Sequence, residues 1–353
     1  MEKLKIAVIG CGTIANAAHI PAYAKRDDCE LAWFCDIIGE RAKTAAEAHG
    51  GKWTTDYKEL LNRSDIDAVS VCTPNNVHAP ISIGFLKAGK DVLCEKPAAL
   101  NYAQALEMQK AKNETGRVLN IGVCNRFNTA VNIIEGLINS GSLGEIYHVY
   151  ASFRSHRSIP GLGGAFTTKE IAGGGALIDW GVHFIDLVMY CCGDPEPKTV
   201  SGEAFCKLGK NIKGYAYKNM WAGPPLLDGV YDVEDSVSAL VRTAGPVITI
   251  HGAWAQNIGV DEMLVDFMGD KGGIRLQYGA GFKIYSTTGE ALATTEIDFN
   301  PDNQYEEEID DFLRTSRAKG TVKSRADIDN AIITSKIIQA VYDSSDAKRE
   351  IVF

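Results

Sequence analysis

Short apolar runs alternate with longer stretches of helical periodicity through the first third of the chain. The apolar runs are each short enough for one buried strand, and they lie at 4–9, 31–35, 68–72, 91–94 and 118–123. The helical stretches between them include 14–25, 56–62, 77–88 and 101–115. Strands that alternate with helices predict a parallel sheet with helices on both faces, because each parallel connection crosses back over the sheet.

The pattern changes from about residue 125. A helix is expected at 130–140, and strands are expected at EIYHVYASFRS and at the alternating runs 198–206, 234–243, 246–254, 260–268 and 281–286. Two further helices are expected at 303–318 and 326–342. At 353 residues the chain is long enough for two domains. We therefore predict an α/β protein with a first domain at 1–124 and an α+β second domain at 125–353 that has an open, mostly antiparallel sheet.

The composition argues against several classes of protein. The net charge of −9 argues against nucleic-acid binding, which needs clustered basic residues. No run of 18 apolar residues occurs, so we expect neither a transmembrane helix nor a membrane partner. The segment MEKLKIAVIGCG lacks the pattern of a signal peptide, and the nine cysteines form no CxxC pair. We therefore expect a cytoplasmic protein with reduced thiols.

The sequence GCGTIA directly follows the first apolar run and begins a helical stretch. It has the G-x-G-x-x-A form of the dinucleotide fingerprint, in which Gly10 allows a tight turn, Gly12 lets the backbone approach a pyrophosphate and Ala15 permits close packing. Asp36 ends the second apolar run, where a carboxylate accepts hydrogen bonds from an adenosine ribose. The alternative is a structural glycine turn with a capping acid, but the strand–turn–helix context favours an N-terminal Rossmann dinucleotide-binding domain.

Two further loops follow apolar runs of the same expected sheet. The sequence TPNNVH at 73–78 follows the third run, and Glu95-Lys96-Pro97 follows the fourth. Ligands of open parallel sheets bind at the carboxyl ends of the strands, which is where both loops lie. Lys96 is either a functional cation at that edge or a solvated lysine before a proline that ends the strand.

Residues 173–190, GGGALIDWGVHFIDLVMY, have the composition of a buried helix that is interrupted by three ionisable groups. Asp179, His183 and Asp186 are spaced by four and three residues, so they share one face of an α-helix. The stripe either makes hydrogen bonds in the core or forms part of an active site. A zinc site needs a third ligand, and no HExxH or CxxC motif supplies one, so we predict no metal.

Five features occur in the order found in a known family: GxGxxA, a strand-end Asp, TPNNxH, EKP and GGGxLxDxGxHxxD. In this combination the chain resembles the Gfo/Idh/MocA oxidoreductase family, strongly from residue 5 to about 190 and more loosely beyond. The resemblance implies NAD(P)-dependent oxidation or reduction of a secondary alcohol, usually of a sugar or cyclitol. It also implies a homo-oligomer, a dimer or tetramer, that associates through the exposed face of the C-terminal sheet.

The resemblance assigns roles to residues at the matching positions. The catalytic residues would be Lys96, Asp179 and His183. The cofactor-binding residues would be Gly10, Gly12, Thr13, Ile14, Asp36, Arg41, Thr73, Pro74, Asn75, His78, Glu95, Lys96 and Asn125. We expect the substrate to contact Lys96, Arg126, His156, Arg157, Asp179, Trp180 and His183. Asp186 and Tyr190 continue the helix face, and we assign them a structural role.

These residues indicate how a secondary alcohol would be oxidised. A hydride leaves the carbinol carbon only as the hydroxyl proton departs, so the site needs a base. His183 is the candidate, because the ordinary pKa of histidine lies near neutral pH. Asp179, one turn earlier, can bind the substrate or the imidazole, and Lys96 can stabilise the oxygen as it gains negative charge.

Asp36 is followed by Ile37 and Ile38 and by no arginine pair that could hold a 2′-phosphate, so NAD is expected in preference to NADP. We predict an NAD-dependent oxidoreductase acting on a sugar or glycoside. The alternatives are an inositol dehydrogenase, a glycoside-processing enzyme with transient sugar oxidation and retained NAD, and an NAD(P)-binding sensor without turnover. A sensor is disfavoured because Lys96 and His183 are both present.

Residues 207–232 form a long connection that is rich in glycine, proline and aromatic residues. Loops of this length inside a compact domain usually serve as lids, binding loops or contacts. Their aromatic side chains either pack on the apolar face of a sugar ring or clasp a neighbouring subunit. The aromatic residues are Tyr215, Tyr217, Trp221 and Tyr231.

Overall fold

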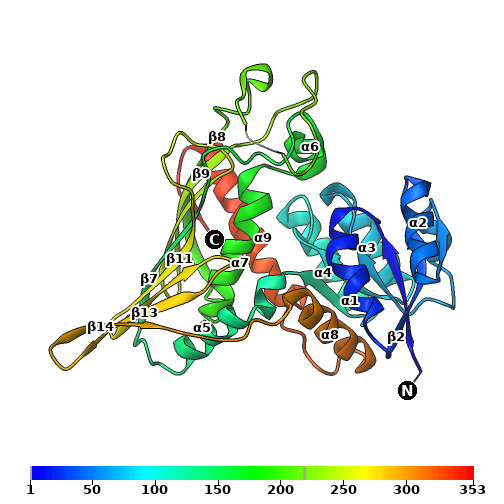
Figure 1. Cartoon of the computed structure of the whole chain (residues 1–353), viewed down its shortest axis with the longest axis horizontal. Helices are drawn as coiled ribbons and strands as arrows, with labels where there is room; N and C mark the ends of the chain where they lie inside the picture. Colours follow the sequence, from blue (N-terminus) through cyan, green and yellow to red (C-terminus); the bar gives the residue numbers. More distant parts are fainter. Residues whose placement is uncertain (1, 218–219) are drawn as a thin grey trace. The chain divides into compact units, whose positions relative to one another are not determined.

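The computed structural model describes residues 2–217 and 220–353, which form two compact units (Figure 1). The first unit consists of Met1–Phe127 and Asp302–Ile332, and the second consists of Asn128–Pro301 and Ile333–Phe353. The chain thus returns to the first unit after it has built most of the second. This division differs from the contiguous domains 1–124 and 125–353 that the sequence predicts.

The first unit contains a parallel six-stranded sheet with the order β3-β2-β1-β4-β5-β6. Its strands are β1 (Leu4–Ile9), β2 (Cys29–Cys35), β3 (Lys52–Thr54), β4 (Ala68–Val71), β5 (Asp91–Glu95) and β6 (Leu119–Gly122). This is the strand order of the Rossmann fold, and it reverses between β1 and β4. The predicted Rossmann fold is therefore confirmed for this unit.

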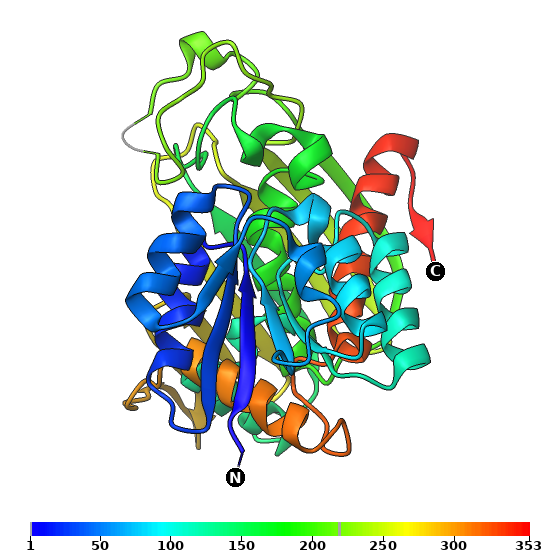
Figure 2. The same ribbon diagram turned by 90° about the vertical axis from the view of Figure 1, so that its right-hand side faces the viewer.

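Helices bury both faces of this sheet (Figure 2). Ala7 and Ile9 of β1 lie in the core on the side of α3 and α4, whereas Ile6 and Val8 lie in the core on the side of α1, α2 and α8. The alternation follows from the period of two in a strand. The helices are α1 (Ile20–Ala24), α2 (Gly39–His49), α3 (His78–Lys87), α4 (Tyr102–Thr115) and α8 (Gln304–Arg317).

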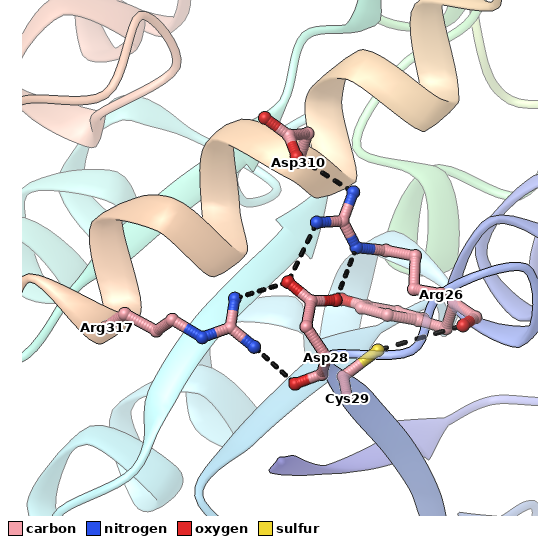
Figure 3. Close-up of polar contacts among 6 residues, drawn as sticks. Arg26, Asp28, Cys29, Asp310 and Arg317 are labelled. Carbon is pink, nitrogen blue, oxygen red and sulfur yellow. Dashed lines mark hydrogen bonds and ion pairs between the residues drawn. The ribbon is translucent and has the colours of Figure 1, made fainter. Parts of the chain in front are cut away.

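Helix α8 is fixed to the first unit by a network of ion pairs (Figure 3). Asp28, just before β2, accepts hydrogen bonds from Arg26 Nε and Nη2 at 2.8 and 2.9 Å and from Arg317 Nη1 of α8 at 2.6 Å. Arg26 Nη1 also lies 2.8 Å from Asp310 Oδ1 of the same helix. The hydrogen bond from Arg26 and the charges of both guanidinium groups lower the pKa of Asp28 to about 2. These contacts, and the apolar face of α8 in the core, explain why this late segment belongs to the first unit.

The second unit contains a nine-stranded sheet with the order β14-β13-β12-β11-β7-β10-β9-β8-β15. Neighbouring strands are antiparallel except for β7 and β10, which are parallel. The strands are β7 (Ile146–Arg154), β8 (Pro197–Phe205), β9 (Ser236–Thr243), β10 (Val247–Ala253), β11 (Glu262–Gly269), β12 (Gly272–Gln277), β13 (Phe282–Thr288), β14 (Ala291–Glu296) and β15 (Ile351–Val352). The predicted open, mostly antiparallel sheet is confirmed.

One face of this second sheet is covered by helices (Figure 1). The helices are α5 (Thr129–Asn139), α7 (Val182–Cys191) and α9 (Ile328–Ala347). They pack with inward-facing strand residues such as Val149 and Phe267 in one core. Outward-facing residues such as Tyr150 and His251 are only half-buried, and their rings lie 6.0 Å apart.

The helical segment Lys169–Cys191 begins with the short helix α6 (Lys169–Ala172) and ends with α7. It has the length and mean hydropathy of a membrane span, but 72% of its most apolar window is buried. It is therefore the core helix of the second unit.

Several short elements differ from the sequence-based expectations. The expected helix at 56–62 is only the 3₁₀ turn Tyr57–Leu60, and β3, β12, β14 and β15 are not expected from the sequence. Strand β14 is largely exposed, so it lacks the apolar alternation by which a strand is recognised. Strands β3 and β15 are too short to show a period at all.

Candidate active site

The turn after β1 is shaped by contacts that only glycine permits. Gly10 has a φ of +90°, and a Cβ atom there would lie 2.5 Å from the carbonyl oxygen of Cys72. Gly12 is different, because no atom lies within 4 Å of the position of its missing Cβ. Gly10 therefore makes the tight turn, and Gly12 leaves the backbone open to a ligand. Thr13 and Ile14 follow at the start of the helical segment.

Asp36 follows β2 and is turned toward this glycine turn. Its Oδ2 accepts a hydrogen bond from the Cys11 N–H at 2.9 Å, and its Oδ1 accepts one from the Ile38 N–H at 2.8 Å. A carboxylate offers about four acceptor positions, so further donors can still bind. Ile37 is 90% exposed beside it, and Arg41 is exposed in the first turn of α2.

Thr73, Pro74 and Asn75 lie just beyond the carboxyl end of β4. The Thr73 hydroxyl is buried and has no hydrogen-bond partner within residues 2–217 and 220–353. A buried hydroxyl without a partner costs free energy, so this position suits a group that a ligand will satisfy. Asn75 begins the 3₁₀ turn Asn75–Val77.

His78, which the resemblance places at the cofactor, joins two loops. Its Nδ1 lies 2.8 Å from the carbonyl oxygen of Pro97, and its Nε2 lies 2.8 Å from that of Thr73. Because a carbonyl oxygen can only accept, both ring nitrogens donate, which requires the charged imidazolium. Burial lowers the pKa of His78, but the adjacent Cys94 and the two carbonyl groups raise it to about 9. The ring thus clamps the Thr73 loop to the Lys96 loop and presents neither nitrogen to a ligand.

Glu95, which the resemblance also places at the cofactor, is buried at the end of β5. Its Oε1 lies 2.7 Å from Nε2 of His19, and its Oε2 accepts a hydrogen bond from the Lys96 N–H at 3.1 Å. Burial raises the pKa of Glu95, but the hydrogen bond with His19 and the positive charges around it leave the pKa lowered. The carboxylate therefore holds the backbone of Lys96, whose side chain is half-buried.

Asn125 and Arg126 follow β6 in the 3₁₀ turn Cys124–Phe127, and both are buried. Arg126 Nη1 donates a hydrogen bond to the carbonyl oxygen of Arg325 at 2.9 Å. This contact links the turn to the segment that returns to the first unit. Arg126, which we expected at the substrate, therefore stabilises the packing of that segment.

Three observations make the first unit fit a dinucleotide such as NAD. Open space at Gly12 lets a pyrophosphate approach the start of a helix, whose N–H groups favour anions. Asp36 retains acceptor positions for ribose hydroxyl groups. The Thr73 hydroxyl needs a partner at the same carboxyl edge of the sheet.

Asp179 and His183 lie at the beginning of the 177–191 helix of the second unit. Asp179 belongs to the π-helical turn Leu177–Gly181, and His183 lies in the first turn of α7. Both side chains are half-buried in a helix whose apolar residues are mostly buried. Single π-helical turns occur often at functional sites, and another one, Ala15–His19, follows the glycine turn of the first unit.

Asp186 and Tyr190 make contacts inside the second unit. Asp186 Oδ1 accepts a hydrogen bond from the Thr334 hydroxyl at 3.2 Å, and the Tyr190 hydroxyl donates to Asn132 Oδ1 at 3.1 Å. These bonds join α7 to α9 and to α5. They agree with the structural role that the sequence gives to both residues.

The sequence does not identify Trp254 or Glu234, which hold the 177–191 helix. Trp254 Nε1 donates a hydrogen bond to Asp179 Oδ2 at 3.1 Å. Glu234 accepts hydrogen bonds from the N–H groups of Gly175 and Leu177, each at 2.9 Å. These partners are 57 to 75 positions apart in the chain, so no local pattern links them. The available signal is that each residue stands at the end of an expected strand.

His156 and Arg157, which we expected at the substrate, are held in a turn near β11. His156 Nδ1 lies 2.9 Å from the carbonyl oxygen of Ile258. Arg157 donates hydrogen bonds to the carbonyl oxygen of Gln256 at 2.9 Å and to Asn257 Oδ1 at 2.7 Å. Both side chains therefore stabilise this turn.

The 206–235 loop, which connects β8 to β9, shares a small apolar core with the segment 159–176 and with Trp254 and Ala255. Tyr215 is buried in this core, and Tyr231 and Trp180 are packed against it. Tyr215 is therefore not available to stack on a sugar. Tyr217 and Trp221 are 45% and 62% exposed. Positions 218–219 of this loop lie outside the described residues.

Neither disulfides nor metal clusters are found in the described part of the chain. All nine cysteines are free thiols, and burial raises the pKa of Cys11 and Cys35 to about 12, so both stay protonated at neutral pH. Among residues 2–217 and 220–353, no group of three or more His, Cys, Asp or Glu side chains is placed to hold a metal ion.

Known proteins match the chain in both units. Residues 4–123 match the oxidoreductase family with an NAD-binding Rossmann fold, and residues 132–275 match the GFO/IDH/MocA C-terminal domain. The D-glucoside 3-dehydrogenase of Escherichia coli (strain K12) is 32% identical over 348 residues, covering 97% of this chain and 95% of that protein. The inositol 2-dehydrogenase of Rhizobium meliloti (strain 1021) is 26% identical over 315 residues, covering 88% of each.

Solved structures share the fold over the full length. Levoglucosan dehydrogenase in complex with NADH and L-sorbose has a TM-score of 0.85 at 22% identity, covering 100% of this chain and 99% of that chain. The aldose-aldose oxidoreductase of Caulobacter crescentus complexed with glycerol has a TM-score of 0.82 at 23% identity and full coverage of both. At such identities these structures establish the fold alone. The near-complete alignment with the glucoside dehydrogenase and the matches of both domains establish more: the chain belongs to the Gfo/Idh/MocA oxidoreductase family.

Proposed function

We propose that the protein is an NAD-dependent dehydrogenase that transfers a hydride between a ring secondary hydroxyl of a sugar or glycoside and the nicotinamide. The observation that carries the proposal is the Asp179–His183 pair. A half-buried imidazole follows, one helical turn later, a carboxylate that the Trp254 indole orients. The similarity to the D-glucoside 3-dehydrogenase favours a glucoside and its C3 hydroxyl.

Each catalytic group has a distinct task in this proposal. NAD supplies the hydride acceptor. His183 takes the hydroxyl proton as general base, and Asp179 fixes the substrate hydroxyl or the imidazole. Lys96 donates a hydrogen bond to the reacting oxygen and stabilises its developing negative charge.

We propose NAD as the cofactor in preference to NADP. The Asp36 carboxylate would repel a 2′-phosphate, and the two residues after it are isoleucines. Arg41 is a nearby cation, but it is solvent-exposed in the first turn of α2, so its charge would offset this repulsion only in part. A structural neighbour, levoglucosan dehydrogenase, forms a complex with NADH, which supports the same choice.

We also propose a cytoplasmic homo-oligomer that associates through the helix-free face of the second sheet. Free thiols at all nine cysteines suit a reducing compartment. The half-buried outward residues of β7 and β10 would provide the contact. Sedimentation of the purified protein gives the mass, and a monomer would contradict this part of the proposal.

The test is an activity screen with NAD⁺ and NADP⁺ against methyl glucosides, free glucose, levoglucosan and myo-inositol. We expect NADH formation with a glucoside, and NMR of the product should place the new ketone on the ring. Preferential turnover of myo-inositol would favour the alternative that the inositol 2-dehydrogenase relative suggests. Cofactor that survives purification, seen by mass spectrometry, would favour a transient oxidation with retained NAD. No turnover with any alcohol would reject the proposal.

A further inference from the structure

The 206–235 loop is bonded along the segment that leads into the 177–191 helix. The Leu226 N–H donates to the carbonyl oxygen of Leu162 at 2.8 Å, and the Thr167 hydroxyl donates to that of Val230 at 2.8 Å. The two segments pack so closely that a Cβ atom at Gly163 would lie 2.1 Å from the Leu226 carbonyl oxygen. The second half of the loop is thus a fixed neighbour of the helix.

Near the end of the loop, the Glu234 carboxylate binds backbone N–H groups at the amino end of the 177–191 helix. Glu234 Oε2 accepts from the Gly175 N–H, and its Oε1 accepts from the Leu177 N–H and from the Tyr342 hydroxyl, all at 2.9 Å. A Cβ atom at Gly175 would lie 1.9 Å from the Glu234 carbonyl oxygen, and one at Gly174 would lie 2.0 Å from the Tyr342 hydroxyl. Gly174 and Gly175 therefore leave the space that Glu234 and Tyr342 occupy at the start of the helix.

The next residue, Asp235, is fully buried and anchors the other end of the loop. Its Oδ2 accepts hydrogen bonds from three successive N–H groups, those of Lys207, Leu208 and Gly209. Its carbonyl oxygen accepts from the Trp254 N–H at 2.9 Å. One dipeptide thereby ties the start of the loop to the backbone of Trp254.

The contacts of Glu234 and of Asp235 are both connected to Asp179 through one further residue. Glu234 holds Gly175, whose carbonyl oxygen accepts from the Asp179 N–H at 3.0 Å, and Trp254 donates its indole N–H to the Asp179 carboxylate at 3.1 Å. The backbone of Asp179 is therefore set through Glu234, and its side chain is set through the residue that Asp235 holds.

We infer that Glu234 and Trp254 are positioning residues for Asp179, so that the end of the 206–235 loop and the residue whose backbone it holds form a scaffold of the catalytic helix. The inference rests on the proposed function, in which Asp179 is catalytic. It predicts that a change far from the substrate lowers turnover without loss of cofactor binding, because only the orientation of the carboxylate is disturbed.

The test uses four single variants of the full-length protein. Glu234→Gln puts an amide NH₂ against a backbone N–H, and Trp254→Phe removes the indole donor to Asp179. We expect each to lower kcat about tenfold, the effect of losing a hydrogen bond with a charged group, with an unchanged dissociation constant for NAD. Tyr342→Phe is the matched control, because it leaves both backbone hydrogen bonds of Glu234, and its kcat should stay within about twofold. Asp179→Asn supplies the reference background.

A coupling measurement separates positioning from a general structural role. In the Asp179→Asn background, Glu234→Gln and Trp254→Phe should lower kcat no further, because the group that they orient is already changed. Full additional losses in that background, or wild-type kcat in both single variants, would overturn the inference. Wild-type turnover of Asp179→Asn would overturn the inference as well, because Asp179 would then have no catalytic role, whereas absence of turnover in the wild-type protein itself would reject the proposed function. If Glu234→Gln does not fold, Trp254→Phe alone decides the coupling.

Discussion

The two units hold their functional groups in different ways. In the first unit, Gly10, Asp36 and Lys96 each lie in a short motif at the end of a parallel strand, so the sheet itself aligns them. In the second unit, Asp179 depends on Glu234, at the end of the 206–235 loop, and on Trp254, just after β10.

This difference shows which parts of a site a motif can encode. Residues of a strand-end motif are positioned by the sheet that the same strands form, because β4 and β5 are paired along their length and end at the same edge. A helix in the second unit receives its orientation from residues that only the folded chain brings near. The comparison also predicts a division of work, in which the glycine turn and Asp36 of the first unit act in cofactor binding. Turnover depends on the helix of the second unit and on Lys96 of the first.

The largest expected effect is on turnover. Replacing His183 by Ala should lower kcat by about 10²–10⁴, the usual contribution of a positioned general base, and should leave NAD affinity unchanged. Lys96→Ala should have a similar effect on kcat while NAD binding stays measurable. Steady-state kinetics would measure kcat, and quenching of the protein's tryptophan fluorescence on addition of NAD would measure the NAD affinity.

A matched control is Lys87→Ala, since Lys87 is an exposed lysine of α3. It should retain wild-type kcat. Near-wild-type turnover of His183→Ala would show that His183 is not catalytic. It would also contradict the assignment of turnover to the helix of the second unit.

The sequence predicts most of the first unit and the existence of the second sheet. The glycine turn, the strand-end Asp36 and the parallel alternation are local, so they are visible without the fold. The return of α8 to the first unit is not visible, because the Asp28–Arg317 ion pair joins positions far apart in the chain. The buried partners of His78 and Glu95 are hidden for the same reason: burial and carbonyl acceptors are properties of the folded backbone.

The second expected effect tests the charge on His78. A folded pKa of about 9 against an ordinary 6.5 stabilises the fold by at most about 3–4 kcal/mol. This stability is fully present below pH 6.5 and is lost as pH rises through about 9, because the unfolded chain then binds fewer protons than the folded one. Denaturant unfolding between pH 6 and 9 should show the decline in the wild type and a much smaller one in His78→Gln.

His49→Gln is the matched control, since His49 is exposed at the end of α2 and should leave the decline intact. Burial raises the pKa of Cys29 to about 11, so the losses from this and similar thiols come at higher pH than the His78 window. A flat profile in the wild type would show that His78 is neutral in the folded protein.

The third expected effect concerns the choice of cofactor. Asp36→Ala should narrow the preference of kcat/KM for NAD over NADP by about 10- to 100-fold, because like-charge repulsion of a 2′-phosphate costs a few kcal/mol. The KM for the sugar should not change if the units divide the work. The matched control is Asp27→Ala, an exposed acid outside the glycine turn. Comparable kcat/KM for the two cofactors in the wild type would contradict the role of Asp36.

The smallest expected effect concerns Trp221, the exposed aromatic of the 206–235 loop. It packs edge-on against Phe166, with ring centroids 5.0 Å apart, and its side chain is nevertheless 62% exposed. If it stacks on the sugar, Trp221→Ala and Tyr217→Ala should raise the KM for the glycoside about threefold to tenfold, with kcat nearly unchanged. Leu227→Ala, an exposed aliphatic change in the same loop, is the control and should leave KM unchanged. Unchanged kinetics with a smaller mass in light scattering would reject the substrate role and assign this aromatic surface to subunit contact.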